Sequence, residues 1–146
     1  MKKILCVFVT LICLTNLWSL DLEKTYGIFK IEIHEKPGTF SVFVTDGETG
    51  NSVPVLSTVN SSSGTRFFLQ MDTNVYPLTY QSGVTVEQFL TAVDARFEYT
   101  LKDKFKVELI LAFFSSTPNS LQDIMRVSFN VLNVDKTSHN FALKTV

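Results

Sequence analysis

The sequence predicts an all-β protein, an antiparallel β-sandwich of about eight strands that follows an N-terminal signal peptide. Three observations lead to this prediction. Beyond the first twenty residues, apolar and polar side chains alternate with a period of two. Clusters of Gly, Pro, Asn, Asp and Ser separate the alternating runs at intervals of about 8–12 residues. Hydrophobic residues make up 45% of the 146 residues and include 13 Phe, which excludes a disordered chain.

The pattern of the first nineteen residues predicts a secretory signal peptide. Two lysines precede an apolar run from Ile4 to Leu14, and a more polar stretch ends at Ser19. The run is shorter than the ~20 residues that a membrane-spanning helix needs. We therefore divide the chain into a signal peptide, 1–19, and a single domain, 20–146, and expect export to the periplasm or cell envelope.

The sequence also allows other ways in which this segment could be processed or retained. Cleavage after Thr15, retention as an uncleaved anchor and lipidation at Cys13 are the alternatives. Both cysteines, Cys6 and Cys13, lie within it. Its removal would leave a domain without a disulfide, a thiolate nucleophile or a cysteine-ligated zinc.

The first strands form the clearest predicted hairpin. Tyr26–His34 and Thr39–Thr45 both alternate, with Phe and β-branched residues on one face. Between them, Glu35-Lys36-Pro37-Gly38 has Pro and Gly in the central positions of a type II turn, where Gly takes a positive φ.

Shorter strands follow in the middle of the chain. Val53–Val59 contains Pro54, which cannot donate to a ladder and predicts an edge strand. The loop 60–64 contains a glycosylation sequon at its start. Thr65–Met71 is a further strand, and Val75–Tyr80 is a short extended piece after a turn at 72–74.

The stretch from Thr85 to Leu101 has two interpretations. Thr85 and Gln88 match a capping box at the start of a helix. An unbroken alternation from Phe89 onward favours a strand. We predict one long strand that bends near Ala92.

Three strands complete the prediction. Phe105–Phe114 is apolar on both faces in its second half, which predicts a central strand covered on both sides. Asp123–Leu132 alternates, and His139–Val146 is the last strand. Its pattern is still running when the sequence stops, so we expect either an edge strand or a domain truncated at its C-terminus.

No residue pattern identifies a catalytic site. The two histidines, His34 and His139, lie on predicted strand faces, and the sequence has no G-x-S-x-G elbow or Gly-rich phosphate loop. We assign no catalytic residue, cofactor or metal ligand, and the chain is not predicted to be an enzyme. The turn residues Asp46, Glu48 and Asn51 are the candidates for calcium, because they offer oxygen ligands. A hairpin turn favours the same residue types.

Charge and aromatic residues limit the classes of partner. Thirteen basic against fourteen acidic residues give no basic surface for nucleic acid. Most Phe fall on the predicted inner faces, whereas Tyr26, Tyr76 and Tyr80 lie near turns and are candidates for surface binding. An unpaired terminal strand at His139–Val146 predicts strand addition or self-association.

Two stretches carry a resemblance to known proteins. Ile31–Thr45 (IEIHEKPGTFSVFVT) and Met125–Val146 (MRVSFNVLNVDKTSHNFALKTV) resemble segments of exported, uncharacterised β-rich proteins of spirochaetes, notably treponemes. They are also similar to the opening strands of mutarotase-like β-supersandwich domains. The shared features are hairpin turns, so the resemblance implies a fold and a glycan as a candidate ligand, and no site residue.

The expected function is a non-catalytic binding or structural role in the envelope. The alternatives are a carbohydrate-active supersandwich domain, or a fragment of one, and a small outer-membrane β-barrel, whose lipid-facing strands also alternate. The charged faces predicted here are the reverse of a lipid-facing surface.

Overall fold

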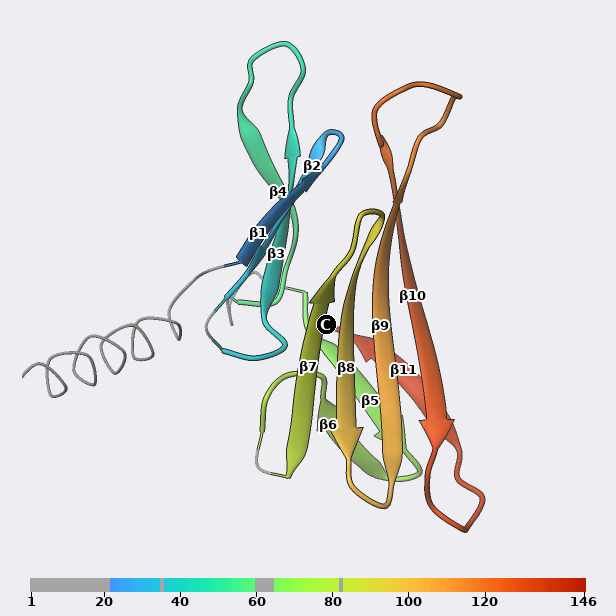
Figure 1. The fold of residues 1–146 in the computed structure, drawn as a ribbon. Helices are drawn as coiled ribbons and strands as arrows, with labels where there is room; N and C mark the ends of the chain where they lie inside the picture. The colour runs from blue at the N-terminus through green and yellow to red at the C-terminus, as the bar shows by residue number, and fades with distance from the viewer. Residues whose placement is uncertain (1–21, 35, 60–64, 82) are drawn as a thin grey trace, which may run out of the picture.

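The structure is a computed structural model that describes residues 22–146, except 35, 60–64 and 82. The described part is all-β and antiparallel, with eleven strands in three sheets rather than about eight (Figure 1). None of its residues forms a helix long and apolar enough to cross a bilayer. The predicted signal peptide 1–19 and the sequon at Asn60 lie outside the described residues. The strands are β1 (Leu22–Tyr26), β2 (Phe29–Ile33), β3 (Phe40–Thr45), β4 (Ser52–Ser57), β5 (Phe67–Met71), β6 (Asn74–Pro77), β7 (Val84–Leu90), β8 (Asp94–Leu101), β9 (Phe105–Phe114), β10 (Ile124–Asn133) and β11 (Phe141–Thr145).

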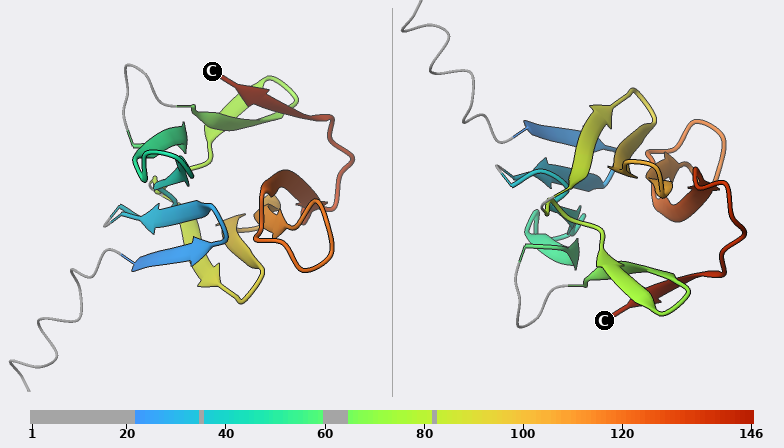
Figure 2. Two further views of the ribbon diagram at one scale, coloured as in Figure 1. Left: turned by 90° about the horizontal axis from the view of Figure 1, so that it is seen from above. Right: turned by 90° about the horizontal axis from the view of Figure 1, so that it is seen from below.

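The three sheets form a sandwich-like arrangement in which one layer is divided. Sheet A has the order β1-β2-β3-β4, sheet B the order β11-β5-β6, and sheet C the order β10-β9-β8-β7. Seen from above and below, sheets A and B lie beside different parts of sheet C (Figure 2). Stacked rings join A to C, with centroids 4.4 Å apart for Phe40 and Phe97. Rings also join sheet B to sheet C, where the ring centroids of Phe67 and Phe129 are 5.2 Å apart.

Sheet C supplies the continuous inner surface of the core. Its strands pair over long registers, and residues opposite one another point to the same face. Alternate residues of β8 and β9 are therefore buried together, whereas their neighbours carry charge outward. The fully buried members include Phe97, Tyr99, Phe105, Val107, Leu109 and Leu111.

The predicted β2–β3 hairpin is confirmed, and its turn attaches sheet A to sheet C. Gly38 has φ +80°, as a type II turn requires. Its amide donates to Gln88 Oε1 at 3.2 Å, and its carbonyl accepts from the Tyr99 hydroxyl at 3.3 Å. A Cβ at this position would lie 2.8 Å from the Tyr99 ring, so only glycine fits both the turn and the contact.

The prediction of one strand over Tyr26–His34 is wrong at its start. The chain turns at Gly27, where φ is +57°, and separates β1 from β2. A Cβ on Gly27 would lie 2.3 Å from backbone atoms of Gln122. Tyr26 and Phe29 lie opposite each other and are both buried, so the buried positions change from even- to odd-numbered residues across this two-residue turn.

The strand with Pro54 is an edge, as predicted. β4 is the last strand of sheet A, and its register against β3 shifts between Val42 and Phe43. The predicted extended piece at Val75–Tyr80 corresponds to β6, a four-residue edge strand of sheet B.

The single bent strand predicted from Thr85 to Leu101 is instead a hairpin of β7 and β8. Thr91 Oγ1 accepts from the Val93 and Asp94 amides at 3.2 and 3.1 Å and donates to Asp94 Oδ1 at 2.6 Å. These local bonds hold a tight turn that reverses the chain. The inward positions change there from even-numbered residues of β7 to odd-numbered residues of β8. Phe89 and Val93, which the predicted alternation placed on the same face as Phe97, are therefore exposed.

Two further expectations need correction. β9 is internal in sheet C, but none of the described sheets covers its outer face. Ala112 is buried there, whereas Phe114 is exposed under Arg126. The last strand begins at Phe141, not His139. His139 belongs to the connection before it, where its side chain bonds to two aspartates.

We predict that Gly27→Ala destabilises the fold far more than Gly50→Ala. Both glycines have positive φ, but a Cβ on Gly50 meets nothing within 4 Å. Gly50→Ala should cost only the left-handed strain of about 1–2 kcal/mol. Gly27→Ala adds a clash with Gln122 and should cost about 3 kcal/mol or more. Urea unfolding of both variants measures the difference, and equal midpoints would show that the β1–β2 turn does not approach Gln122 this closely.

Candidate functional site

A hollow of about 710 Å³ lies where sheets A and B meet. Its walls come from the β2–β3 turn, the end of β4, the start of β5 and the end of β6. We call it the A–B cleft. The described residues that line it are His34, Lys36, Thr39, Thr58, Val59, Arg66, Phe67, Phe68, Pro77 and Thr79. Its volume lies within the ~300–1,000 Å³ range of small-molecule sites.

The polar part of the cleft is basic. His34, Lys36 and Arg66 line it, and none of its described lining residues is acidic. Lys36 is exposed in the turn. The backbone of Arg66 is fixed by a reciprocal pair of hydrogen bonds with Val146, at 2.8 and 3.0 Å. The arrangement favours a negatively charged group.

The rest of the described wall consists of three threonines and four apolar residues, Val59, Phe67, Phe68 and Pro77. Phe67 is buried against Phe129, whereas Phe68, on the opposite face of β5, is half-buried and lines the cleft with Pro77. The amide of Leu78 donates to the Phe67 carbonyl at 2.8 Å, which fixes the end of β6 against β5. A ligand here would meet cations on one side and a ring on the other.

A chain of hydroxyl groups extends from the cleft into sheet A. His34 Nε2 lies 3.0 Å from Ser41 Oγ, which lies 2.9 Å from Ser57 Oγ. Ser41 is only 5% exposed, so its hydroxyl faces protein atoms and not the cleft. The chain satisfies polar groups between β3 and β4 and holds the His34 ring at the cleft wall.

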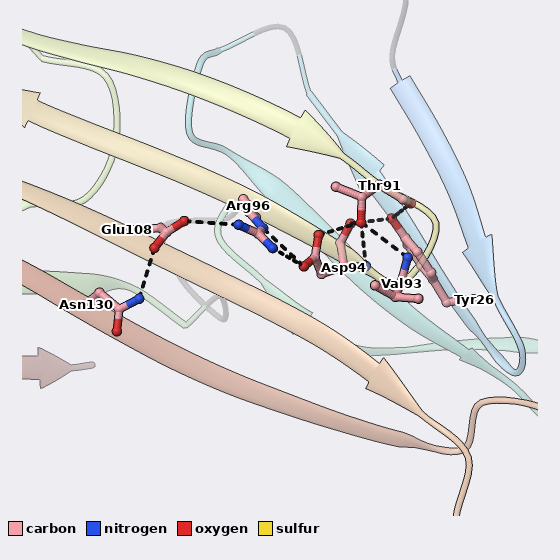
Figure 3. A network of polar contacts seen from close by, with 7 residues as sticks. All are labelled: Tyr26, Thr91, Val93, Asp94, Arg96, Glu108 and Asn130. Carbon is pink, nitrogen blue, oxygen red and sulfur yellow. Dashed lines mark hydrogen bonds and ion pairs between the residues drawn. The ribbon is translucent and has the colours of Figure 1, made fainter. Parts of the chain in front are cut away.

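A second polar network crosses the outer side of sheet C (Figure 3). The Tyr26 hydroxyl donates to the carbonyls of Asp94 and Thr91, at 2.8 and 3.1 Å. The Asp94 carboxylate accepts from Arg96 at 2.7 Å. Arg96 also forms an ion pair with one oxygen of Glu108 at 3.6 Å. The other oxygen of Glu108 accepts a hydrogen bond from the Asn130 side-chain amide at 2.9 Å.

The network is structural in character. Burial, and then the charge of Asp94, raise the pKa of Tyr26 to about 12, so this hydroxyl stays protonated and serves as a donor. The hydrogen bond from Arg96 is the largest of the effects that lower the pKa of Asp94. Tyr26 therefore ties sheet A to the β7–β8 turn while its ring stacks on Phe113, and it is not a free surface-binding residue.

The other two tyrosines that the sequence places near turns differ from it. The Tyr76 ring packs edge-on against Phe105, 5.0 Å between centroids, and is half-buried. Tyr80 is exposed, and its amide donates to the Pro37 carbonyl beside the A–B cleft.

The turn residues considered for calcium are engaged in the turn itself. Asp46 Oδ1 accepts from the amides of Glu48 and Thr49, at 2.8 and 3.3 Å, which is an Asx turn. These bonds, that from Glu48 first, lower the pKa of Asp46. Asn51 contributes its backbone carbonyl to the Asp46 amide. Within the described residues, no three His, Cys, Asp or Glu side chains are arranged to hold a metal ion.

Sequence reasoning missed a cluster around His139, which we call the His139 clamp. The ring Nδ1 lies 2.6 Å from Asp72, and Nε2 lies 3.1 Å from Asp135 and 2.8 Å from Thr137. The Asn140 amide donates to the other oxygen of Asp72 at 3.0 Å. The clamp joins the β10–β11 connection to the β5–β6 turn. Its members are far apart in sequence, so only a D-x-x-x-H spacing at 135–139 could have suggested it.

Comparison with other proteins adds no relative. No protein-family model, curated protein or solved structure matches the chain. The function must therefore be argued from the A–B cleft and the surfaces of the sheets.

We predict that the His139 clamp makes stability depend on pH. Its hydrogen bonds to Asp72, and then Asp135, raise the pKa of His139. A histidine with a raised pKa stabilises the fold fully at pH values below its unfolded pKa of about 6.5. This stabilisation is lost as the pH rises through its folded pKa. The unfolding free energy should therefore fall as the solution becomes alkaline.

The same clamp acts in the opposite direction on its carboxylates. The pKa of Asp72 is lowered, first by the Asn140 amide, and that of Asp135 is lowered, first by His139. These two carboxylates stabilise the fold at pH values above their unfolded pKa of about 3.8. This stabilisation is lost as the pH falls through their lowered folded pKa values. Urea unfolding across pH should show a loss at both ends. His139→Gln should remove the alkaline loss, and His34→Gln should keep it, because that variant leaves the clamp intact.

Proposed function

We propose that this chain is an exported, non-catalytic binding protein of the cell envelope, built as an antiparallel β-sandwich. Its ligand is a small molecule with an anionic group and an apolar part, and it binds in the A–B cleft. The observation that carries the proposal is a hollow of ligand size with three basic residues and two Phe on its walls and no described acidic residue.

The chemistry of the cleft supports binding rather than catalysis. A hydrolase needs an accessible nucleophile next to its base. The hydroxyl nearest to His34 belongs to Ser41, which is buried and shared with Ser57. A glycosidase needs a pair of carboxyl groups across the bound sugar. The described lining residues offer hydroxyl, ammonium, guanidinium and imidazole groups instead.

The charge and apolar requirements can be tested separately with the fluorescent probe 1-anilinonaphthalene-8-sulfonate, an aromatic sulfonate. We expect saturable binding to the folded chain that weakens with added salt. Lys36→Met should weaken it by about five-fold, equivalent to about 1 kcal/mol. Phe68→Ala should weaken it at both low and high salt, because it removes apolar contact.

Lys102→Met is the matched control, because this substitution removes the same charge from an exposed residue of the β8–β9 turn. It should leave the binding of the probe unchanged. Equal losses for Lys36→Met and Lys102→Met would contradict a site in the cleft. Displacement of the probe by neutral disaccharides, but not by aliphatic carboxylates, would contradict the anionic ligand and favour a glycan.

The export part of the proposal has a separate test. The full-length chain should be processed when it is expressed in a bacterium with a secretion pathway. We expect mass spectrometry to show a protein that begins at Leu20, in the osmotic-shock fraction. A protein that keeps Met1 and stays with the cytoplasmic fraction would contradict export and would leave the cleft proposal standing.

A further inference from the structure

Strand β10 is an edge strand without the usual protections of an edge. In the part of the chain that the structure describes, it pairs with β9 alone, over ten residues and with no register shift. It contains no Pro and a single charged residue, Arg126. Native edge strands usually carry charges, prolines or bulges that prevent pairing with another chain. Their absence here marks an edge that is available for pairing.

The outer face of β10 carries Arg126, Ser128 and Asn130 between two apolar ends, and apolar side chains on both faces are incompletely covered. Val127 and Val131 point to the inner face yet are 38% and 39% exposed. Ile124 and Leu132 point to the outer face and are 46% and 60% exposed. Apolar side chains exposed beside an unpaired strand are typical of a surface that another chain covers. β10 therefore combines an unpaired edge with apolar side chains that the described chain leaves exposed.

The sequence of β10 is self-complementary about Ser128. Read in either direction from that residue, the polarity of Ile-Met-Arg-Val-Ser-Phe-Asn-Val-Leu is the same. Residues opposite one another in an antiparallel pair point to the same face. Pairing β10 with a second β10 about Ser128 would place Ile124 opposite Leu132, Met125 opposite Val131, Arg126 opposite Asn130 and Val127 opposite Phe129.

We propose that a second copy of this chain docks on β10 by antiparallel strand pairing centred on Ser128. The two-fold axis would join the two C sheets into one eight-stranded sheet. Such an interface is isologous, so each favourable pair occurs twice. The inference does not depend on the proposed ligand or on export.

Charge supports the same register. Arg126 lies over the Phe114 ring and makes no ion pair with a described residue. In the dimer it lies opposite Asn130 of the second copy, whose amide already bonds to Glu108 at 2.9 Å. Beside this edge is a hollow of about 440 Å³ whose lining includes Glu98 and Glu108. The lining also includes Lys106, which pairs with Glu98 at 2.6 Å. Glu108 is therefore the carboxylate of this lining that the long Arg126 side chain of the second copy would approach.

The terminal strand offers a poorer edge than β10. β11 has five residues, pairs with β5 along its whole length and carries Lys144. A shorter edge with a lysine resists strand addition. The self-association expected at His139–Val146 from the sequence is therefore assigned instead to β10.

Sedimentation equilibrium of the purified full-length chain should give about twice the monomer mass of 16.5 kDa. Ile124→Lys with Leu132→Lys should abolish the dimer, because two like charges then lie opposite each other on both sides of the axis. Ile124→Lys with Leu132→Glu should restore it in a salt-sensitive form. The paired Val53→Lys and Val55→Lys change on the β4 edge is the matched control and should leave the dimer intact.

Cross-linking tests the register itself. With Cys6 and Cys13 replaced by Ser, Ser128→Cys should form a disulfide-linked dimer with oxidised glutathione, because the two thiols face each other at the axis. Asn130→Cys should not, because its copies would be about 13 Å apart along the strands. A monomeric wild-type chain, or equal cross-linking at 128 and 130, would overturn the proposal. Matching circular dichroism of all variants shows that none has failed to fold.

Discussion

The inner face of sheet C is one continuous apolar surface, and the described chain is organised by the way it covers that surface. Sheet A covers one part through rings stacked at 4.3–4.4 Å. Sheet B covers another through Phe67 and Tyr76, at 5.2 and 5.0 Å. Because the covering layer is divided, its two sheets meet at a boundary. The A–B cleft lies at that boundary, so the candidate ligand site is a consequence of how the core is closed.

Few long-range polar contacts fix the positions of the sheets. The Tyr26 hydroxyl and the Gly38 backbone join sheet A to sheet C. The His139 clamp joins the β10–β11 connection to sheet B. Each of these contacts satisfies a polar group where two apolar faces end, and each therefore specifies an arrangement that hydrophobic burial alone leaves loose. The edge at β10 has no such closure within the described chain, and apolar side chains on both of its faces are exposed.

The sequence alone determined the all-β class, the antiparallel pairing and most strand positions, because burial of one face imposes a period of two. It also identified Phe105–Phe114, the Pro-Gly turn before Thr39 and the edge position of Pro54, because these depend on local chemistry. It failed at Gly27 and at Thr91, where a turn changes the buried positions from even- to odd-numbered residues. At Thr91 the exposed Phe89 and Val93 mimic the buried register of β8. Of the calcium candidates that it named, Asp46 accepts hydrogen bonds from the amides of its own turn.

Only the tertiary structure decided which residues lie together. His34, Lys36 and Arg66 reach one cleft from two sheets, and His139 meets Asp72 across 67 positions of sequence. Such clusters leave no periodic signal, because each residue looks like an ordinary polar side chain within its own strand or turn. The division of one layer into two sheets is also a tertiary feature, and each part fits sheet C through aromatic rings. That fit depends on ring positions in space, which alternation in the sequence does not specify.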